Sequence, residues 1–535
     1  HRHTMRRSEN HDRFHTHDRT RSAVILALGI TILFGVGDVA FASTEIIREI
    51  RIVRGNVFTE SEANQNRAFH TANVMHVTTR DHVIRGRLLF GEGDVVDNEL
   101  LLATERTIRE LEFVNEARIR VIRVDDRTVD IEVHTDDAWT LVPGIVFESG
   151  GGITEVGATA ADTNFAGFGK KLWVEGIHNT DEGTNYAAGY TDPQVLNTWW
   201  QADVNFKTGP LIDAVNFSAL RPFYSPDTEW AFGGFANWRS AERRLFENGD
   251  EVSRFLESSR RAQIFAARAF GPRYNKLTAD LQFVYDERRF DFTKGTPVSL
   301  PDDELNLTTS VGLFWRKESW VKENRIRKMT ITEDIRLGHE VGARVGRAGI
   351  PIPKGEKYWD VRGSYRHAMV PGNGQYLFLS NDVSTEDDQN TILLTQARYF
   401  YKVTPWQTLA LNVQFKRAWN LESSRQISLG GESGLRGFRA RRFNGNKSVL
   451  MNAETRLFSP LEIYTVALGA VAFVDAGRAW ESGSQIDLDE LGYSVGVGMR
   501  FGFTRAPGEP IGRIDLGWPL SDGGFAFTIG SEQQF

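Results

Sequence analysis

The chain has 535 residues, enough for two or three domains or for one large barrel with a small domain, and its 41% of hydrophobic residues excludes a disordered protein. Its net charge of −7 argues against a general nucleic-acid binder, and the absence of cysteine excludes disulfides, thiolate metal sites and a lipid-modified cysteine. Fifty glycines and an aromatic fraction of 11% favour an all-β protein with glycine-rich turns and aromatic girdles.

The first 42 residues have the features of a secretory signal peptide. A stretch rich in arginine and histidine precedes an uncharged apolar run at Ala23–Gly37, and Ala40–Ala42 then follows the small-x-small pattern of a cleavage site. We expect cleavage after Ala42; the alternative is a retained N-terminal anchor, for which the run is short. After Ala42 no apolar run approaches the ~18 residues of a spanning helix, so the mature chain is predicted to be soluble or to cross a membrane as strands.

Residues 45–137 are predicted to form a small α/β domain. Period-2 and helical spacing of the apolar residues predict the order strand, helix, helix, strand, strand, with Asp97 as the cap of the second helix. The five elements are expected at residues 46–53, 78–90, 97–114, 117–125 and 128–136. This order, with the segments VIRGRLLFGEGD and ATERTIRELEFVNEARI, resembles a POTRA domain, the periplasmic module of the outer-membrane assembly-factor superfamily. The alternative is an unrelated small α/β domain.

From about Trp139 onward, apolar and polar residues alternate in segments of about ten residues. Examples are residues 277–286, 305–315, 408–416 and 493–503. Glycines and charges gather on one face of these segments, while the other face is apolar and aromatic, as expected for a polar lumen and a lipid contact. A soluble sandwich would also alternate, but its strands are shorter than the length a tilted strand needs to cross a bilayer. We therefore predict that residues 138–535 form an antiparallel transmembrane β-barrel in a bacterial outer membrane.

The segment SLGGESGLRGFRARRFNGN, which lies between two predicted strands, contains no complete nucleophile elbow and no complete phosphate-binding loop. We therefore expect no enzymatic activity. The segment resembles the conserved loop of the BamA/TamA-type superfamily in its signature residues, Leu435, Arg436, Gly437 and Phe438, and in its preceding glycines, Gly430, Gly431 and Gly434. The resemblance implies a loop that folds back into the lumen, where glycines permit close packing against the wall.

The resemblance also implies that Arg436 lies against carboxylates on the inward faces of the next two strands. Alternation places Glu454 and Asp475 on the polar faces, and FVDAGRAW matches the aromatic-x-Asp-x-Gly strand of the family. A guanidinium offers a planar fork of donors that fits a carboxylate. We expect Arg436 within hydrogen-bonding reach of at least one of these carboxylates; the alternative is an ordinary exposed loop arginine.

The last strand is expected over Gly524–Phe535. Phe527 and Ile529 alternate on one face of it, and with Phe535 they are similar to the C-terminal signal by which outer-membrane barrels are recognised for assembly. This strand would close the barrel against the strand near Ile153–Asp162. Alternation marks fourteen candidate strands before the glycine-rich loop and five after it, whereas the resemblance implies eleven and five, so we predict sixteen strands.

The resemblance implies an outer-membrane protein assembly or translocation factor that binds client strands at the edge of the POTRA-like sheet and passes them through a gated barrel. The implied partners are the outer-membrane bilayer, unfolded outer-membrane or secreted clients, and periplasmic chaperones or accessory proteins; no cofactor, metal or nucleic acid is expected. The alternative is a dedicated secretion channel or a passive transport pore. The basic segment Trp315–Lys328 allows two interpretations, a contact with lipid phosphates or a solvated loop.

Overall fold

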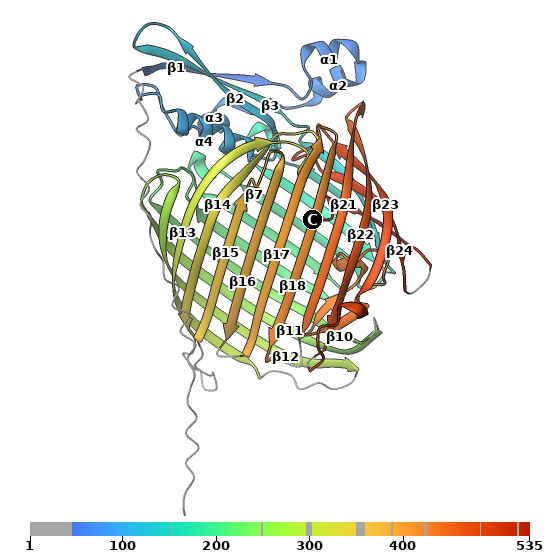
Figure 1. Cartoon of the computed structure of the whole chain (residues 1–535). Coiled ribbons are helices and arrows are strands. Elements are labelled where there is room, and N and C mark those ends of the chain that lie inside the picture. Colours follow the sequence, from blue (N-terminus) through green and yellow to red (C-terminus); the bar gives the residue numbers. More distant parts are fainter. Residues whose placement is uncertain are drawn as a thin grey trace, which may run out of the picture. The chain divides into compact units, whose positions relative to one another are not determined.

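The computed structural model describes residues 45–535 except 151, 248–249, 296–301, 349–358, 387–388, 422–424, 482 and 522–523. The predicted signal peptide, residues 1–42, lies outside the described residues. Within the described part, a three-stranded sheet with short helices precedes a closed sheet of twenty strands (Figure 1). No helix of this part is long and apolar enough to cross a membrane.

The first part is an α/β region in which β3 is the central strand, parallel to β1 and antiparallel to β2. Its elements are β1 (Ile46–Gly55), α1 (Glu60–Gln65), α2 (Arg67–Met75), α3 (Asp81–Arg85), α4 (Asn98–Arg109), β2 (Val114–Arg123) and β3 (Thr128–Asp137). Two helices are therefore present where none was expected, and the helix expected over 78–90 has only five residues. Thr59 and Glu62 form a capping box that starts α1, and Gly86 ends α3 after little more than one turn.

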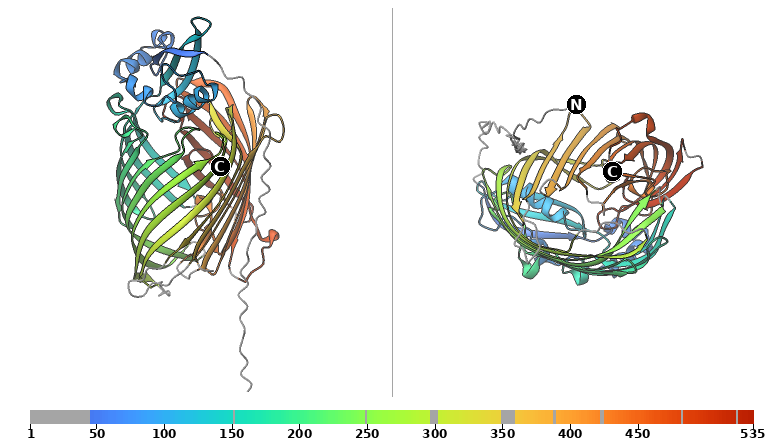
Figure 2. Two further views of the ribbon diagram at one scale, coloured as in Figure 1. Left: turned by 90° about the vertical axis from the view of Figure 1, so that its left-hand side faces the viewer. Right: turned by 90° about the horizontal axis from the view of Figure 1, so that it is seen from below.

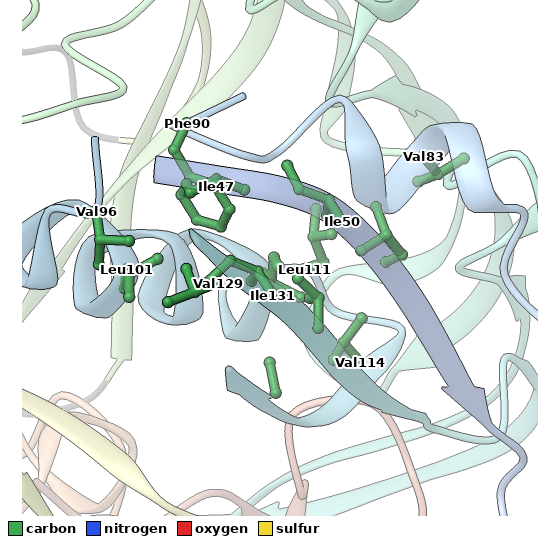
Figure 3. Packing of buried hydrophobic residues seen from close by; sticks show 14 of the residues in the cluster. Ile47, Ile50, Val83, Phe90, Val96, Leu101, Leu111, Val114, Val129 and Ile131 are labelled. Carbon is green, nitrogen blue, oxygen red and sulfur yellow. The ribbon is translucent and has the colours of Figure 1, made fainter. Parts of the chain in front are cut away.

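Apolar side chains from the helices and the sheet pack into one core in this region (Figure 3). Ile47 and Ile131, from neighbouring strands, are 1% and 0% exposed, and Ile108 of α4 is also fully buried. Burying one large aliphatic side chain in this way stabilises the folded state by about 1.5–3 kcal/mol. This core holds the helices against the three-stranded sheet.

We expect Ile131→Ala to destabilise the α/β region by about 2–5 kcal/mol, because it removes a fully buried side chain from the central strand. The same change at Ile122, on the neighbouring strand β2 and 40% exposed, should cost less than about 0.5 kcal/mol. Limited proteolysis of the purified protein, with cleavage sites mapped to residues 45–137, measures the difference. Equal protease resistance of both variants would contradict this placement of the core.

The second part is the barrel, whose strands each pair antiparallel with the next along the sheet (Figures 1 and 2). The strands are β4 (Leu141–Gly150), β5 (Ile153–Asp162), β6 (Lys171–Asn179), β7 (Gly183–Asp192), β8 (Gln201–Gly209), β9 (Ile212–Arg221), β10 (Trp230–Glu247), β11 (Asp250–Phe270), β12 (Asn275–Gly295), β13 (Glu304–Glu323), β14 (Glu333–Arg347), β15 (Trp359–Met369), β16 (Gln375–Glu386), β17 (Gln389–Thr404), β18 (Gln407–Trp419), β21 (Lys447–Ile463), β22 (Val466–Trp480), β23 (Gly492–Phe503), β24 (Ile511–Pro519) and β25 (Ala526–Ser531). The faces alternate as expected: Val311 and Leu313 are 56% and 55% exposed, while Asn306 is 3% exposed. An all-β barrel is therefore confirmed.

The prediction of sixteen strands is wrong: the described sheet has fifteen strands before the glycine-rich loop and five after it. The first strands, β4 to β9, have only nine or ten residues each; tight turns alternate with eight-residue loops between them. A tilted strand of about this length crosses a bilayer, so these short hairpins belong to the wall. The alternation of side chains marks these hairpins as strands, and the sixteen-strand count implied by the resemblance does not hold for this chain.

The predicted closing pair is also wrong. The last strand, β25, meets β4, and the expected partner at Ile153–Asp162 is β5, the second strand of the barrel. Among the described residues, the register of β25 with β4 contains one residue pair, Ile529 with Ser149, whereas β4 and β5 pair along their full lengths. β25 is short because it ends at Ser531 rather than continuing to Phe535. The β25–β4 seam therefore has the fewest paired residues of any junction in the described part of the barrel.

Ion pairs connect the α/β region to one end of the barrel. Arg109 of α4 pairs with Asp334 at the start of β14, with Nε 2.9 Å from Oδ2. Arg273, in the turn between β11 and β12, lies 2.5 Å from a carboxylate oxygen of Asp97, the residue that caps α4. These contacts identify the end of the barrel that faces the α/β region, which we call the proximal end.

Candidate functional site

The glycine-rich loop between β18 and β21 packs against the inner wall of the barrel. It contains a short antiparallel ribbon of β19 (Ile427–Leu429) and β20 (Phe443–Gly445). The predicted signature residues lie at the tip of the ribbon, between these two strands. Leu435 and Phe438 are 0% and 2% exposed and pack with apolar residues of the ribbon and of the wall strands β21 and β22. These two side chains anchor the loop on either side of Arg436.

Two of the loop glycines have backbone conformations that other residues rarely adopt. Gly434 has φ 108° and Gly437 has φ 92°, and these turns place Arg436 toward the wall. Gly517 of β24 completes the close approach, since a Cβ atom there would lie 3.0 Å from the nitrogen of Gly437 and 3.2 Å from its Cα. The contact is backbone against backbone, so neither partner has a side chain that could move aside.

We expect Gly517→Val to loosen the loop from the wall at a cost of about 1–3 kcal/mol, because the new side chain would overlap the backbone of Gly437. Gly512→Val on the same strand is the matched control, since its nearest neighbour lies 3.8 Å from the added Cβ. The measurement is protease cleavage of the loop in the folded barrel. Equal protection of the loop in both variants would show that the close approach is not required.

Arg436 is fully buried and bonded to two carboxylates. Its Nε and Nη2 atoms donate to the two oxygens of Asp475, each at 2.8 Å, and its Nη1 atom donates to Oε1 of Glu454 at 2.7 Å. The guanidinium also lies over the ring of Phe473, with 3.5 Å between its central carbon and the ring centroid. The structure thus brings the three charged residues singled out in the sequence together at one place.

Strand register explains why both carboxylates reach the same guanidinium. Asn452 and Glu454 of β21 lie opposite Asp475 and Phe473 of β22, all on the inner face. Asn452 donates to an oxygen of Asp475 at 2.8 Å and to the carbonyl of Gly434 at 2.9 Å, and so holds the carboxylate and the loop together. A register shift of one residue would turn these side chains to the lipid side.

The network is larger than sequence reasoning suggested. Arg456 donates to Glu454 at 2.8 Å, and Arg500 donates to Asp515 at 2.7 Å, so that three guanidiniums alternate with three carboxylates. Asp515 also accepts from Nη1 of Arg436 at 3.4 Å. Alternation in IGRIDLGW, which puts Arg513, Asp515 and Gly517 on one face, is the signal that could have identified the third carboxylate.

This network has no arrangement suited to catalysis. Every member is a guanidinium, a carboxylate or an amide, and each charged member is bonded to an opposite charge. Among the described residues, no group of three or more His, Cys, Asp or Glu could hold a metal ion. The network can hold the loop against β21, β22 and β24, the strands that lead to the β25–β4 seam.

The segment between β13 and β14 is a second inward contact of this network. The carbonyl of Ile326 accepts from Arg456 at 3.0 Å, and the backbone nitrogen of Met329 donates to the buried Glu509 at 2.8 Å. Ile326 and Met329 are 0% and 2% exposed. The interpretation of Trp315–Lys328 as a solvated loop is therefore wrong, because part of it belongs to β13 and part folds inward at the proximal end.

The three residues of the predicted C-terminal signal lie in two places. Phe527 is 45% exposed on β25, and Ile529 shares its outward face. Phe535 instead packs inside, next to Phe400, and its carbonyl accepts from Arg456 at 3.2 Å. The chain changes direction at Glu532, whose φ of 63° ends the strand.

Residues 355–532 match the family model described as the Omp85 superfamily domain. No curated protein matches the chain. Among solved structures, the BamA of Haemophilus ducreyi lacking POTRA domains 1-3 is 14% identical, with 91% of this chain and 85% of that chain covered and a TM-score of 0.41. CdiB from Escherichia coli is 14% identical, with 91% and 76% covered and a TM-score of 0.45. CdiB from Acinetobacter baumannii is 12% identical, with 91% and 74% covered and a TM-score of 0.44.

Proposed function

We propose that this chain, whose residues 355–532 match the Omp85 superfamily domain, inserts other polypeptides into an outer membrane or translocates them across it. The observation that carries the proposal is the β25–β4 seam, with one residue pair in register. A sheet that is firmly paired everywhere else has one junction that can part at small cost in hydrogen bonds. The outward-facing apolar belt of the other strands keeps the barrel in the bilayer while the seam opens.

In this proposal the luminal network keeps the strands on one side of the seam rigid. Arg436 holds the loop to Asp475 and Glu454 on the strands that precede β25, so these strands stay rigid when the seam parts. The loop motif, Leu435 to Phe438, and its glycines therefore act by positioning the wall, and no step requires a cofactor. An incoming segment can pair with the exposed backbone of β4 or β25 by strand addition.

We further propose that the α/β region, residues 45–137, is a single POTRA-like domain in the periplasm that receives clients. Its strand β2 lies at one edge of the three-stranded sheet, and Val121 and Ile122 on that strand are 44% and 40% exposed. An extended client segment could add to this edge through main-chain hydrogen bonds before it reaches the barrel. Chaperones or accessory proteins that deliver clients would act at the same place.

Depletion of the protein followed by quantitative proteomics of the outer membrane tests the proposal. Loss of several barrel proteins supports an assembly factor, and loss of one secreted protein supports a dedicated channel. An unchanged outer-membrane and secreted proteome contradicts both, and conductance in a planar bilayer would then favour a passive pore. A strain that expresses the Arg436→Ala variant in place of the native chain separates a function of the network from a general effect of depletion.

A further inference from the structure

Three basic side chains lie in one row on the outer face of the barrel. Lys317 of β13 is directly opposite His339 of β14, which is directly opposite His367 of β15. They alternate along their strands with inward-facing residues and share the face of the exposed Leu313 and Val345. We call Lys317, His339 and His367 the basic row.

The register places the basic row at the proximal rim of the wall. Lys317 is also opposite Asn275, the first residue of β12, and His367 is two residues from the end of β15. One step further from the rim, the outward residues on the same strands are Leu277, Trp315, Val341 and Tyr365. Aromatic residues at the edge of an apolar belt mark the level of the membrane interface, so the basic row lies at the level of the lipid headgroups.

Among the described residues the row has no carboxylate partner, and Lys317 supplies a positive charge to which protonation of either imidazole would add. The charged residues next in sequence, Arg316, Glu318, Glu340 and Arg366, face the lumen and pair with one another; Arg316 and Glu340 are 2.8 Å apart. The outward neighbours of the row on β12 and β16 are Asn275 and Leu379, which carry no charge.

The two imidazoles are stacked, with ring centroids 4.1 Å apart, and the indole of Trp315 lies 6.2 Å from His339 on the other side. His367 contacts the carbonyl of Gly338 through Nδ1 at 3.0 Å. Two imidazolium ions this close to each other and to Lys317 repel, so full protonation requires an anion beside them. The stacked imidazoles lie at the membrane interface, where they can contact such an anion.

We propose that the basic row binds the headgroup phosphate of an anionic phospholipid in the leaflet at the proximal end of the barrel. Lys317 and one imidazolium contact the phosphate, while the acyl chains lie along the apolar residues further up the same strands. Protonation of an imidazole adds positive charge to the row, so occupancy rises as the pH falls. The site is separate from the lumen and does not depend on the proposed function.

Native mass spectrometry of the detergent-purified chain tests this, with phosphatidylglycerol and phosphatidylcholine titrated at about pH 5.5 and about pH 7.5. We expect phosphatidylglycerol to bind more tightly than phosphatidylcholine, and by a larger factor at the lower pH. The triple variant Lys317→Gln, His339→Gln, His367→Gln should weaken phosphatidylglycerol binding at least about tenfold at the lower pH, since each interfacial cation contributes roughly fivefold. Arg268→Gln, which removes another outward cation, one that stacks on Trp230, is the matched control and should bind as the native chain does.

Equal binding of the two lipids, or an unchanged triple variant, overturns the proposal. Full competition by inorganic phosphate also overturns it, because the row would then be a site for free phosphate rather than for a lipid. If the triple variant does not fold, His339→Gln alone suffices: it should reduce the pH dependence of phosphatidylglycerol binding while Arg268→Gln leaves it intact. An intact pH dependence in His339→Gln rules out the imidazole stack as the binding group.

Discussion

Replacing Arg436 by alanine should leave a barrel that still inserts into the membrane but unfolds at a lower temperature and loses most of its client handling. The change removes the Arg436 donors that bond Asp475 at 2.8 Å and Glu454 at 2.7 Å, and leaves both buried carboxylates with fewer partners. Removing one partner of a buried ion pair typically costs about 3–5 kcal/mol. The gel-shift temperature of the folded barrel and the outer-membrane proteome measure the two effects.

Arg436→Lys is the informative companion to this variant. Lysine keeps the charge but cannot supply the planar fork that meets both oxygens of Asp475, so we expect a partial loss of both heat resistance and function. Arg441→Ala is the matched control on the same loop, because Arg441 pairs with the partly exposed Asp181 and such pairs contribute up to about 1 kcal/mol. Native behaviour of both Arg436 variants would remove the network from the proposed mechanism.

Locking the seam with a disulfide should abolish client insertion while leaving the barrel folded. Ile529→Cys with Ser149→Cys joins the single residue pair between β25 and β4, and directly opposed residues of an antiparallel pair are within reach of a disulfide. The chain has no cysteine of its own, so no other disulfide can form. We expect activity near background when the pair is oxidised and recovery on reduction, measured by insertion of a radiolabelled barrel protein into proteoliposomes.

Phe147→Cys with Val156→Cys is the control, because it crosslinks β4 to β5 away from the seam. This disulfide should form and leave activity unchanged. Full activity of the oxidised seam variant would show that β25 and β4 do not separate during the reaction. The proposed opening would then be excluded even if the depletion experiment identified an assembly factor.

Alternation of side chains predicted individual strands well. The segments expected at 493–503 and 408–416 correspond to β23 and β18 because the period of two is a local property of extended backbone. The helices of the α/β region were predicted less well: a capping box at Thr59 starts a helix where the apolar pattern is weak. Local hydrogen bonds of the cap, rather than apolar periodicity, determined that element.

The residues of the luminal network also fall into those that the sequence predicted and those that it did not. The resemblance of the loop to the superfamily signature singled out Arg436, and alternation then placed Glu454 and Asp475 on the inward faces, since a strand shows from its own sequence which side chains share a face. Asp515, Arg500 and Arg456 were missed as partners, because membership of the network depends on which inward residues of four different strands contact one another. That depends on register across the sheet, which no single segment encodes.

The amino-acid sequence by itself determined that the chain forms a barrel with an apolar outside, a polar inside and an arginine-bearing loop between two late strands. Only the tertiary structure decided that the barrel has twenty strands, that β25 meets β4 through one residue pair, and that Lys317, His339 and His367 form one row. Face alternation is a property of each strand alone. Strand number, closure and register arise from hydrogen bonds between segments far apart in the chain, so they appear only when the sheet is complete.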